Sequence, residues 1–225
     1  MLSFFLDFFW ILAQTVLMAE SSIETKKKLL ESAKKEFLQK GFAGASLRTI
    51  AANAGVTTGA MYRHFKDKDD FFCALVDGAV EATQKVVMFA DSKTHAGFDS
   101  PNLKEHIDFE KKMTFDFLKY VFENFDAFEL LLTKAAGSAH ERFQEDICEL
   151  YTKNCEDTFN WMRKQGFAKK KVSSMTVHFM ASTVINAFCD IILHKMTKRQ
   201  AAAYISDVME FTRAGWIKLM GMDRL

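Results

Sequence analysis

The chain has 225 residues, of which 49% are hydrophobic, and its formal net charge is +1. This length provides one compact unit or two small ones, and the near-neutral charge excludes a uniformly polycationic protein. One proline and ten glycines are too few breakers for a fold of many short strands and turns. Because apolar residues recur mainly at spacings of three and four, we predict an all-α protein.

Residues 1–18, MLSFFLDFFWILAQTVLM, are strongly apolar and aromatic. A signal peptide would have basic residues before its apolar run, and this segment has none. A membrane anchor would need about twenty apolar residues, whereas Asp7 and Gln14 interrupt this run. We favour a third interpretation, in which translation begins at Met18 and residues 1–18 are a mis-assigned extension. A peripheral membrane helix or an additional packing helix is the alternative.

The first regular helix is predicted over 22–40, where Ser22 or Thr25 can serve as its N-terminal cap. Apolar residues at three- and four-residue spacing give this helix one face that can be buried. Gly41 is expected to end it, because glycine readily adopts the positive φ found at helix ends.

Two short helices joined by a tight turn are predicted between 46 and 65. Ser46 caps the first and Thr57 the second, since a side-chain oxygen at each position can accept a backbone N–H. Gly55 supplies left-handed backbone in the turn between them. This arrangement favours a helix-turn-helix, in which the second helix enters the major groove of DNA.

A long fourth helix is predicted to begin at Asp67, with Asp70 in the capping-box position, and to continue to about residue 90. The polar residues 91–103, which include Pro101, are predicted to form a linker. Five further helices are expected beyond it, over about 104–125, 126–136, 138–165, 172–195 and 198–220.

Charge is distributed unevenly along the chain. From 23 to 68 there are ten basic and four acidic residues, a net charge of +6, which leaves −5 for the rest. A basic segment on a nearly neutral protein is typical of a nucleic-acid-binding domain. A solvated, lysine-rich helix face has the same composition, so charge alone leaves both interpretations open.

Sequence motifs for catalysis and metal binding are not found. The chain has no Gly-rich phosphate loop, no H-E-x-x-H and no G-x-S-x-G. Its four cysteines form no C-x-x-C pair and show no metal-ligand spacing, which predicts reduced thiols in a cytosolic protein. We therefore predict that the protein is not an enzyme and that it holds no metal or cofactor.

One motif runs through both short helices into the fourth: Leu47-x-x-Ile50-Ala51-x-x-Ala54-Gly55-Val56-x-x-Gly59-x-x-Tyr62-x-His64-Phe65-x-x-Lys68. With the preceding Phe37-x-x-x-Gly41-Phe42, it closely resembles the DNA-binding domain of the tetracycline-repressor (TetR/AcrR) family, over about residues 25–85. The resemblance implies an N-terminal three-helix head joined by a long fourth helix to a C-terminal helical domain for ligand binding and dimerisation. The implied boundaries are 19–68, 69–90 and 91–225.

The matched positions define a set of residues that we expect to contact DNA. Thr58, Gly59 and Ala60 form the leading end of the recognition helix, where small side chains can reach base edges and thymine methyl groups. Polar side chains around them can bind phosphates. Taken singly, Tyr62 and His64 can also be packing residues. The full set is Arg48, Thr49, Thr57, Thr58, Gly59, Ala60, Tyr62, Arg63, His64 and Lys68.

The family resemblance also implies a homodimer, whose two recognition helices enter successive major grooves of a near-palindromic operator. The last two long helices, over 172–193 and 201–219, carry wide apolar faces that can form a four-helix bundle between two subunits. The alternative is that these faces, which include Phe179 and Phe211, are buried within one monomer.

By the same resemblance, the C-terminal domain is expected to bind a small hydrophobic effector that changes the spacing of the two heads. No dense basic cluster interrupts its apolar helices, which favours an apolar effector over a strongly anionic one. Aromatic residues at helical spacing are more commonly plain core. The candidate effector-binding residues are Phe117, Tyr120, Tyr151, Asn154, Phe159, His178 and Asn186.

Together, these features predict a cytoplasmic, ligand-responsive transcriptional regulator of double-stranded DNA, and we favour a repressor. An activator has the same sequence features, because the sign of regulation depends on the position of the operator. A ligand-binding or adaptor protein whose head does not bind DNA is the alternative from another class. No membrane association is expected unless residues 1–18 are genuine and form an anchor.

Overall fold

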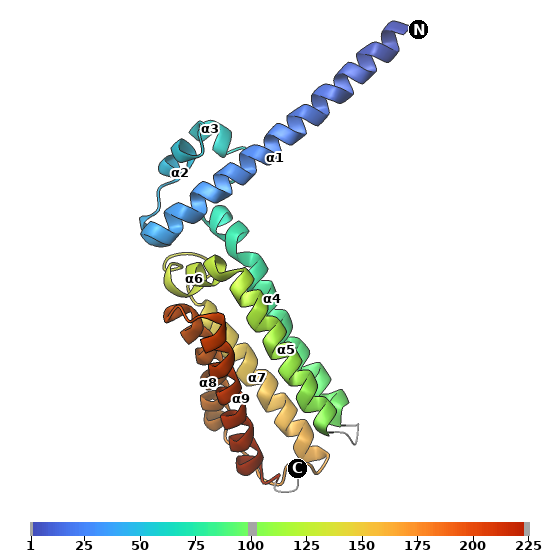
Figure 1. Cartoon of the computed structure of the whole chain (residues 1–225), viewed down its shortest axis with the longest axis vertical. Helices are drawn as coiled ribbons and strands as arrows, with labels where there is room; N and C mark the ends of the chain where they lie inside the picture. The colour runs from blue at the N-terminus through green and yellow to red at the C-terminus, as the bar shows by residue number, and fades with distance from the viewer. Residues whose placement is uncertain (1, 99–102, 223–225) are drawn as a thin grey trace. The chain divides into compact units, whose positions relative to one another are not determined.

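The computed structural model describes the backbone of residues 2–98 and 103–222 and the side chains of residues 21–88 and 108–222. In these backbone ranges the chain forms nine α-helices and no strand, which confirms the all-α prediction (Figure 1). The helices are α1 (Leu2–Gly44), α2 (Leu47–Asn53), α3 (Thr58–Met61), α4 (Lys68–Phe98), α5 (Leu103–Glu123), α6 (Phe125–Thr133), α7 (Phe143–Lys164), α8 (Ser174–Leu193) and α9 (Lys198–Met220).

The chain divides into two compact units. Residues 1–75 and 134–139 form the N-terminal unit, and residues 76–133 and 140–225 form the C-terminal unit. The segment 134–139 joins the N-terminal unit through two hydrogen bonds: the Phe42 N–H donates to the carbonyl oxygen of Lys134 (2.8 Å), and the Ala139 N–H donates to Asp69 Oδ1 (2.9 Å). Helix α4 begins in the N-terminal unit and continues into the C-terminal one.

Helix α1 begins at Leu2 and passes through Ser22 and Thr25 without interruption, so the cap predicted at these residues is wrong. The chain before them contains no proline or glycine, and the Thr25 hydroxyl instead donates to the carbonyl oxygen of Ser21, one helical turn back (2.8 Å). The apolar extension 1–18 is helical from residue 2, and its side chains lie outside the described residues. At Gly41 the predicted positive φ is confirmed at 70°, although helical turns resume as far as Gly44.

The predicted caps and turn of the helix-turn-helix are confirmed. The Ser46 side chain accepts from the Thr49 N–H (3.4 Å), and the Thr57 side chain caps α3 in the same way. Gly55 has φ +71°. Asp67 Oδ1 accepts from the backbone N–H three residues on, at the start of α4 (2.9 Å). Helix α3 ends at Met61, earlier than predicted, and hydrogen-bonded turns follow to residue 65.

Aromatic rings form the centre of the N-terminal unit. The Phe37 ring meets the rings of Phe42 and Phe72 at centroid distances of 6.0 and 5.3 Å. Phe65 stacks on Phe71 at 3.8 Å, which joins the end of the helix-turn-helix to α4. Large apolar side chains buried together in this way supply most of the stability of a small unit.

Two buried polar side chains of α1 hold α2 in place. The Ser32 hydroxyl donates to the carbonyl oxygen of Ile50 (2.9 Å), and a Glu36 carboxylate oxygen accepts from the Ser46 N–H (3.2 Å). Each buried polar group therefore has a partner, as native interiors require. Helix α1 is thus attached to the N-cap and the middle of α2.

Helix α4 extends to Phe98, so the linker predicted over 91–103 is wrong for residues 91–98. Polar residues such as those at 91–96 are tolerated in a helix, and proline, the strongest breaker, comes only at 101. Residues 99–102 lie outside the described residues.

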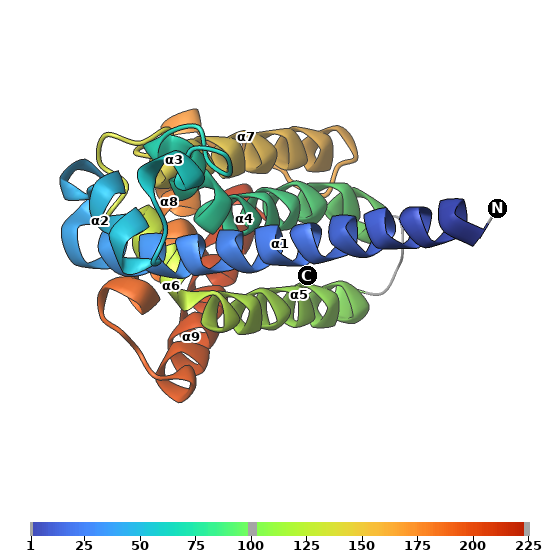
Figure 2. The same cartoon turned by 90° about the horizontal axis from the view of Figure 1, so that it is seen from above.

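The remaining helices of the C-terminal unit lie close to their predicted spans. Helix α8 contacts α6, α7 and α9, and α5 contacts α6 and α9. Seen from above, α4 runs between α5 and α7 (Figure 2). Long helices that pack around a common interior in this way can leave a ligand site between them.

Candidate functional site

The segment that follows the turn is exposed along one side of the N-terminal unit. Thr57, Thr58 and Gly59 are exposed, and Tyr62 is 54% exposed. Met61, between these residues and Tyr62, is by contrast fully buried. One side of the segment therefore anchors it while the other is accessible to a ligand, as a recognition helix requires.

The other residues that we expect to contact DNA lie around this segment, and they differ in how exposed their side chains are. Arg48 and Thr49, in the first turn of α2, are exposed, as is Arg63. Ala60 and His64 are half-buried. A Cβ added at Gly59 would meet nothing within 4 Å, so at this residue the backbone itself forms the surface.

Lys68 has a structural role that the sequence did not reveal. Its Nζ donates to the carbonyl oxygens of Ala43 (3.3 Å) and Ala45 (3.4 Å) and lies 4.7 Å from the centroid of the Phe42 ring. These contacts join α4 to residues 23 and 25 positions earlier in the chain. The Lys68 ammonium therefore neutralises carbonyl groups at the end of α1. Its contact with DNA stays a prediction.

Lys68→Met is expected to lower the free energy of unfolding by about 1–2 kcal/mol, because it keeps the aliphatic stem and removes the charged donor. Lys66→Met is the matched control, since its side chain is exposed. Urea unfolding followed by circular dichroism measures both variants. Equal unfolding midpoints for the two would contradict the structural role of Lys68.

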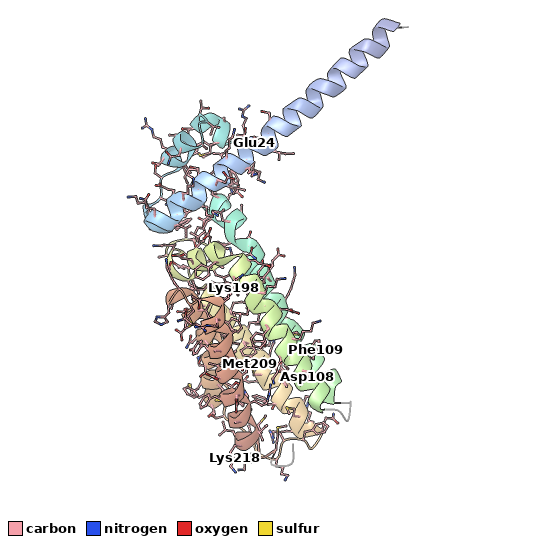
Figure 3. The ribbon with its side chains drawn as sticks, viewed as in Figure 1. Glu24, Asp108, Phe109, Lys198, Met209 and Lys218 are labelled. Carbon is pink, nitrogen blue, oxygen red and sulfur yellow. The ribbon has the colours of Figure 1, made fainter. Side chains whose placement is uncertain are left out.

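The C-terminal unit encloses a cavity of about 360 Å³. Its wall is mainly apolar and comes from α4 through α9; Met209 on α9 is one of the lining residues (Figure 3). Aromatic rings contribute much of this wall, including Phe159 and Trp216, whose centroids lie 4.3 Å apart. A mostly apolar cavity of this volume is typical of small-molecule sites.

Four of the seven candidate effector-binding residues line the cavity: Phe117, Tyr151, Asn154 and Phe159. The Asn154 Nδ2 donates to the carbonyl oxygen of Val87 (3.1 Å), which ties α7 to α4 at the cavity wall. Cys155, burial and the Glu110 carboxylate all raise the pKa of Tyr151 well above its usual value, so its phenol stays neutral at pH 7.

The other three candidates, Tyr120, His178 and Asn186, do not line the cavity, so we no longer expect them to contact an effector there. The Tyr120 hydroxyl donates to the carbonyl oxygen of Gly78 (2.9 Å). His178 and Asn186 are exposed on the side of α8 that meets α7, where His178 contacts the Thr152 hydroxyl and Asn186 Oδ1 accepts from Gln144 Nε2 (2.9 Å). Sequence periodicity did not distinguish the inner from the outer side of α8, because apolar residues occur on both.

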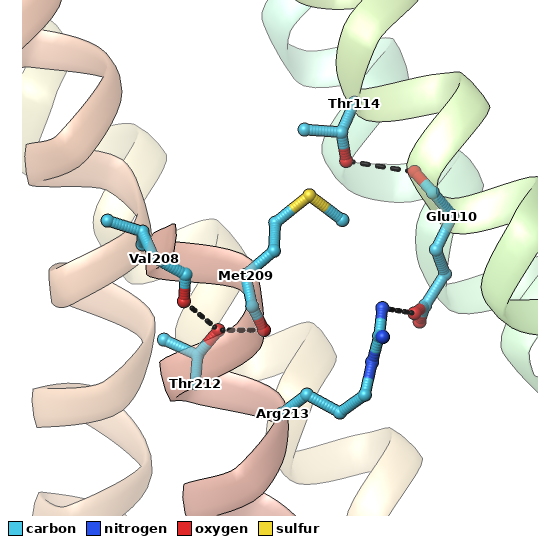
Figure 4. Close-up of polar contacts among 6 residues, drawn as sticks. All are labelled: Glu110, Thr114, Val208, Met209, Thr212 and Arg213. Atoms are coloured by element: carbon cyan, nitrogen blue, oxygen red, sulfur yellow. Dashed lines mark hydrogen bonds and ion pairs between the residues drawn. The ribbon is translucent and has the colours of Figure 1, made fainter. Parts of the chain in front are cut away.

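Two charged lining residues were missed. Arg213 reaches from α9 towards Glu110 on α5, with 3.7 Å between Nη2 and Oε2 (Figure 4). Each occurs among apolar residues at helical spacing: Met113 and Phe117 follow Glu110, and Met209 precedes Arg213 by one turn. A lone charge on an otherwise apolar helix face is the one sequence signal that could have identified each of them.

The outer side of α8 and α9 carries exposed apolar side chains. Phe179 is 63% exposed and Phe211 65%, and Met175 and Leu219 are also exposed. Ile185, Phe188, Ile192 and Val208, which belong to the same predicted dimer surface, line the cavity instead. The inner side of these helices is therefore buried within one chain, while the dimer interpretation of the exposed side stays a prediction.

This two-sided composition explains a further property of α8. Among the described residues, Ser174–Leu193 is the one helix long and apolar enough to cross a membrane. Seven of its residues are buried inside the unit. An apolar inner side and an apolar outer side together raise its mean hydropathy, without any lipid being needed.

Comparison with known proteins assigns the N-terminal unit to a family. A family model described as bacterial regulatory proteins, tetR family, matches residues 29–75. The chain is 38% identical over 79 residues to the HTH-type transcriptional repressor BepR of Brucella suis biovar 1 (strain 1330). This alignment covers 35% of each protein. It is 51% identical over 49 residues to the HTH-type transcriptional regulator AcrR of Shigella flexneri, or 22% of this chain and 23% of that protein.

These alignments span about a third or less of the length of the relatives, whereas fold similarity extends further. The structure of NalD, the secondary repressor of the MexAB-OprM multidrug efflux pump in Pseudomonas aeruginosa, matches with a TM-score of 0.58 at 16% identity, over 85% of this chain and 96% of NalD. An SmeT–triclosan complex matches with a TM-score of 0.57 at 18% identity, over 85% and 90%. At these identities the likeness concerns the fold alone.

The motif, the family model and the geometry agree on one region. Residues 29–75 run from α1 through the helix-turn-helix into α4, and they carry the confirmed caps and the exposed α3. The fold similarity to NalD extends over 85% of this chain and so includes residues of both units. Residues 29–75, which carry the helix-turn-helix, therefore match the tetR family of bacterial regulatory proteins.

Proposed function

We propose that this protein is a one-component transcriptional regulator, which binds a near-palindromic operator as a homodimer and releases it when a small hydrophobic effector occupies the cavity. The proposal is carried by one observation: an exposed recognition segment, anchored by Met61, within the residues that match the family model. We favour a repressor, because BepR and NalD are described as repressors. Its place of action is the cytoplasm.

The exposed side chains suggest how DNA is read. Thr58 and Gly59 would face base edges, while Tyr62, Arg63 and Arg48 would hold phosphates on either side. Few of these side chains can make a bidentate contact with a base. Recognition would therefore depend strongly on the shape and deformability of the operator.

The exposed apolar side of α8 and α9 supports the dimer. Met175, Phe179 and Phe211 lie on two helices that contact each other, and large exposed apolar side chains grouped together mark association surfaces. A two-fold axis beside them would bring two copies of each helix into a four-helix bundle.

The lining of the cavity suggests how an effector would act. Thr83, Val86 and Val87 of α4 belong to the wall, and α4 continues into the N-terminal unit. A ligand that binds one position of α4 more tightly than another would shift the equilibrium between DNA-competent and DNA-incompetent dimers.

Arg63→Ala tests the DNA-binding assignment on a duplex that the wild-type protein has selected from random sequences. We expect affinity to fall by about ten-fold, and the slope of log affinity against log salt to decrease by about 1, because one phosphate contact is lost. Fluorescence anisotropy at several salt concentrations measures both. Lys112→Ala, which removes an exposed cation from α5, is the control and is expected to change neither.

An equal loss in Arg63→Ala and Lys112→Ala would reject this interface. Failure of the wild-type protein to select any duplex would reject the regulator itself. It would favour the alternative, a ligand-binding or adaptor protein whose N-terminal unit does not read DNA.

A further inference from the structure

The charge of the cavity wall is concentrated in one pair of side chains. Among the described residues that line the cavity, Glu110 and Arg213 are the only charged ones. Glu110 is 43% exposed and Arg213 is 29% exposed, so the pair lies where the cavity meets solvent. The rest of the wall offers an apolar surface with a few hydroxyl and amide groups.

Arg213 has unused hydrogen-bonding capacity. Its guanidinium carries five N–H donors, and its shortest contact with Glu110, 3.7 Å, is longer than a hydrogen bond. Within the described side chains, Arg213 has no hydrogen-bond acceptor. The neighbouring hydroxyls of Thr114 and Thr212 donate to carbonyl oxygens of their own helices instead (Figure 4).

Stability does not account for this arrangement. A partly exposed ion pair at 3.7 Å contributes little to folding, and, within the described part of the chain, the Arg213 guanidinium gains no protein hydrogen bond from its place at the edge of the apolar cavity. The Arg213 side chain therefore fits a ligand that supplies the missing acceptor, with the apolar wall beside it for the rest of that ligand.

We propose that the effector is an amphipathic organic acid, with a hydrophobic body in the apolar cavity and a carboxylate bound by Arg213. The proposal rests on the proposed function, since it specifies the ligand of the same cavity. A planar carboxylate matches the guanidinium with two parallel hydrogen bonds. This proposal revises the expectation of a purely apolar effector, which followed from the lack of a basic cluster. A single arginine is sufficient to bind one carboxylate.

When such a ligand binds, we expect the Glu110 carboxylate to move away from Arg213. It is more exposed than Arg213, so its carboxylate can turn into water at a lower cost when an anion takes its place. A cationic ligand would have to pair with Glu110 while lying beside Arg213, which would repel it. Glu110 thus disfavours weakly held anions and keeps the empty cavity neutral.

The test uses two pairs of ligands that differ in charge but hardly in shape: biphenyl-4-carboxylate with biphenyl-4-carboxamide, and decanoate with decanamide. Binding is followed by tryptophan fluorescence, to which Trp216 on the cavity wall contributes. We expect the wild-type protein to bind at least one acid about ten-fold more tightly than its amide, because charge-assisted hydrogen bonds are the stronger ones.

Variants of Arg213 and Glu110 test whether these two residues cause the preference for the acid over the amide. Arg213→Gln is expected to lower the affinity for the acid about ten-fold while changing that for the amide by less than about two-fold. Glu110→Gln should raise the affinity for the acid. Arg199→Gln, an exposed arginine that is also on α9 but does not line the cavity, is the control and should change neither.

Three results would overturn the proposal: equal binding of acid and amide by the wild-type protein, an equal loss of both in Arg213→Gln, or no binding of any of the four ligands. Tighter binding of decylamine than of decanoate would overturn it as well, and would assign ligand binding to Glu110. If an amide bound as tightly as its acid and caused the protein to dissociate from its operator, the acid preference would be rejected while the proposed function would stand.

Discussion

Replacing both Phe179 and Phe211 with glutamate is expected to convert the proposed homodimer into a monomer. Each side chain is more than 60% exposed in the single chain, at 63% and 65%, so the fold of the monomer should be retained. At a two-fold interface each new carboxylate would be brought close to its counterparts and removed from water, which is strongly unfavourable. Sedimentation velocity at micromolar concentrations measures the change.

The same double variant should lose operator affinity by at least about a hundred-fold, because two linked DNA-binding units gain this much or more from binding one duplex together. Met88→Glu is the control, since it adds a carboxylate at an exposed apolar position of α4. A wild-type protein that is monomeric at every concentration, or a double variant that still dimerises, would show that this side of α8 and α9 is not the interface.

Gly59→Leu is expected to reduce operator binding to the level of non-specific binding, a loss of about a thousand-fold or more. The new side chain would project from the exposed backbone of α3, where it meets no protein atom within 4 Å at the Cβ, and would hold the helix away from the groove. Folding stability should stay equal or rise by up to about 1 kcal/mol, since leucine is the better helix former. Anisotropy and thermal unfolding measure the two effects.

Gly55→Ala is expected to have the opposite effect to Gly59→Leu: it should lower stability and leave operator binding nearly unchanged. Gly55 has φ +71°, where a Cβ is strained by about 1–2 kcal/mol, so this variant should lose stability. It lies in the turn rather than at the tip of α3, and the folded fraction should bind the operator with little change. If Gly59→Leu lost stability, or if both variants lost affinity equally, close approach of α3 to DNA would not be the reason for a glycine at 59.

Errors in the sequence-based elements came from residues whose effect depends on their surroundings. Ser22 and Thr25 are suitable caps, but a cap operates only where the preceding chain leaves the helix, and here α1 continues from Leu2. The segment 91–98, which begins with five polar residues, looked like part of a linker, yet it prolongs α4. In both cases the residue composition was taken to mark the end of a helix, although no proline or glycine lies at residue 22 or residue 90.

The sequence placed aromatic residues of inner helix faces at the cavity, but it misplaced residues of a helix that is apolar on two sides. Phe117, Tyr151 and Phe159 line the cavity, whereas His178 and Asn186 lie outside it. The pair Glu110 and Arg213 was overlooked, because the two residues are 103 positions apart and only the packing of α5 against α9 brings them together.

The sequence by itself determined the helical fold and the helix-turn-helix, because caps and turns depend on hydrogen bonds that span only a few residues. Ser46, Gly55 and Thr57 each behave as their local chemistry predicts. Only the tertiary structure decided that Lys68 is engaged by the end of α1, which side of α8 faces inward, and that a cavity with one arginine lies between the helices. These features arise from contacts between distant segments, whose pairing no local spacing encodes.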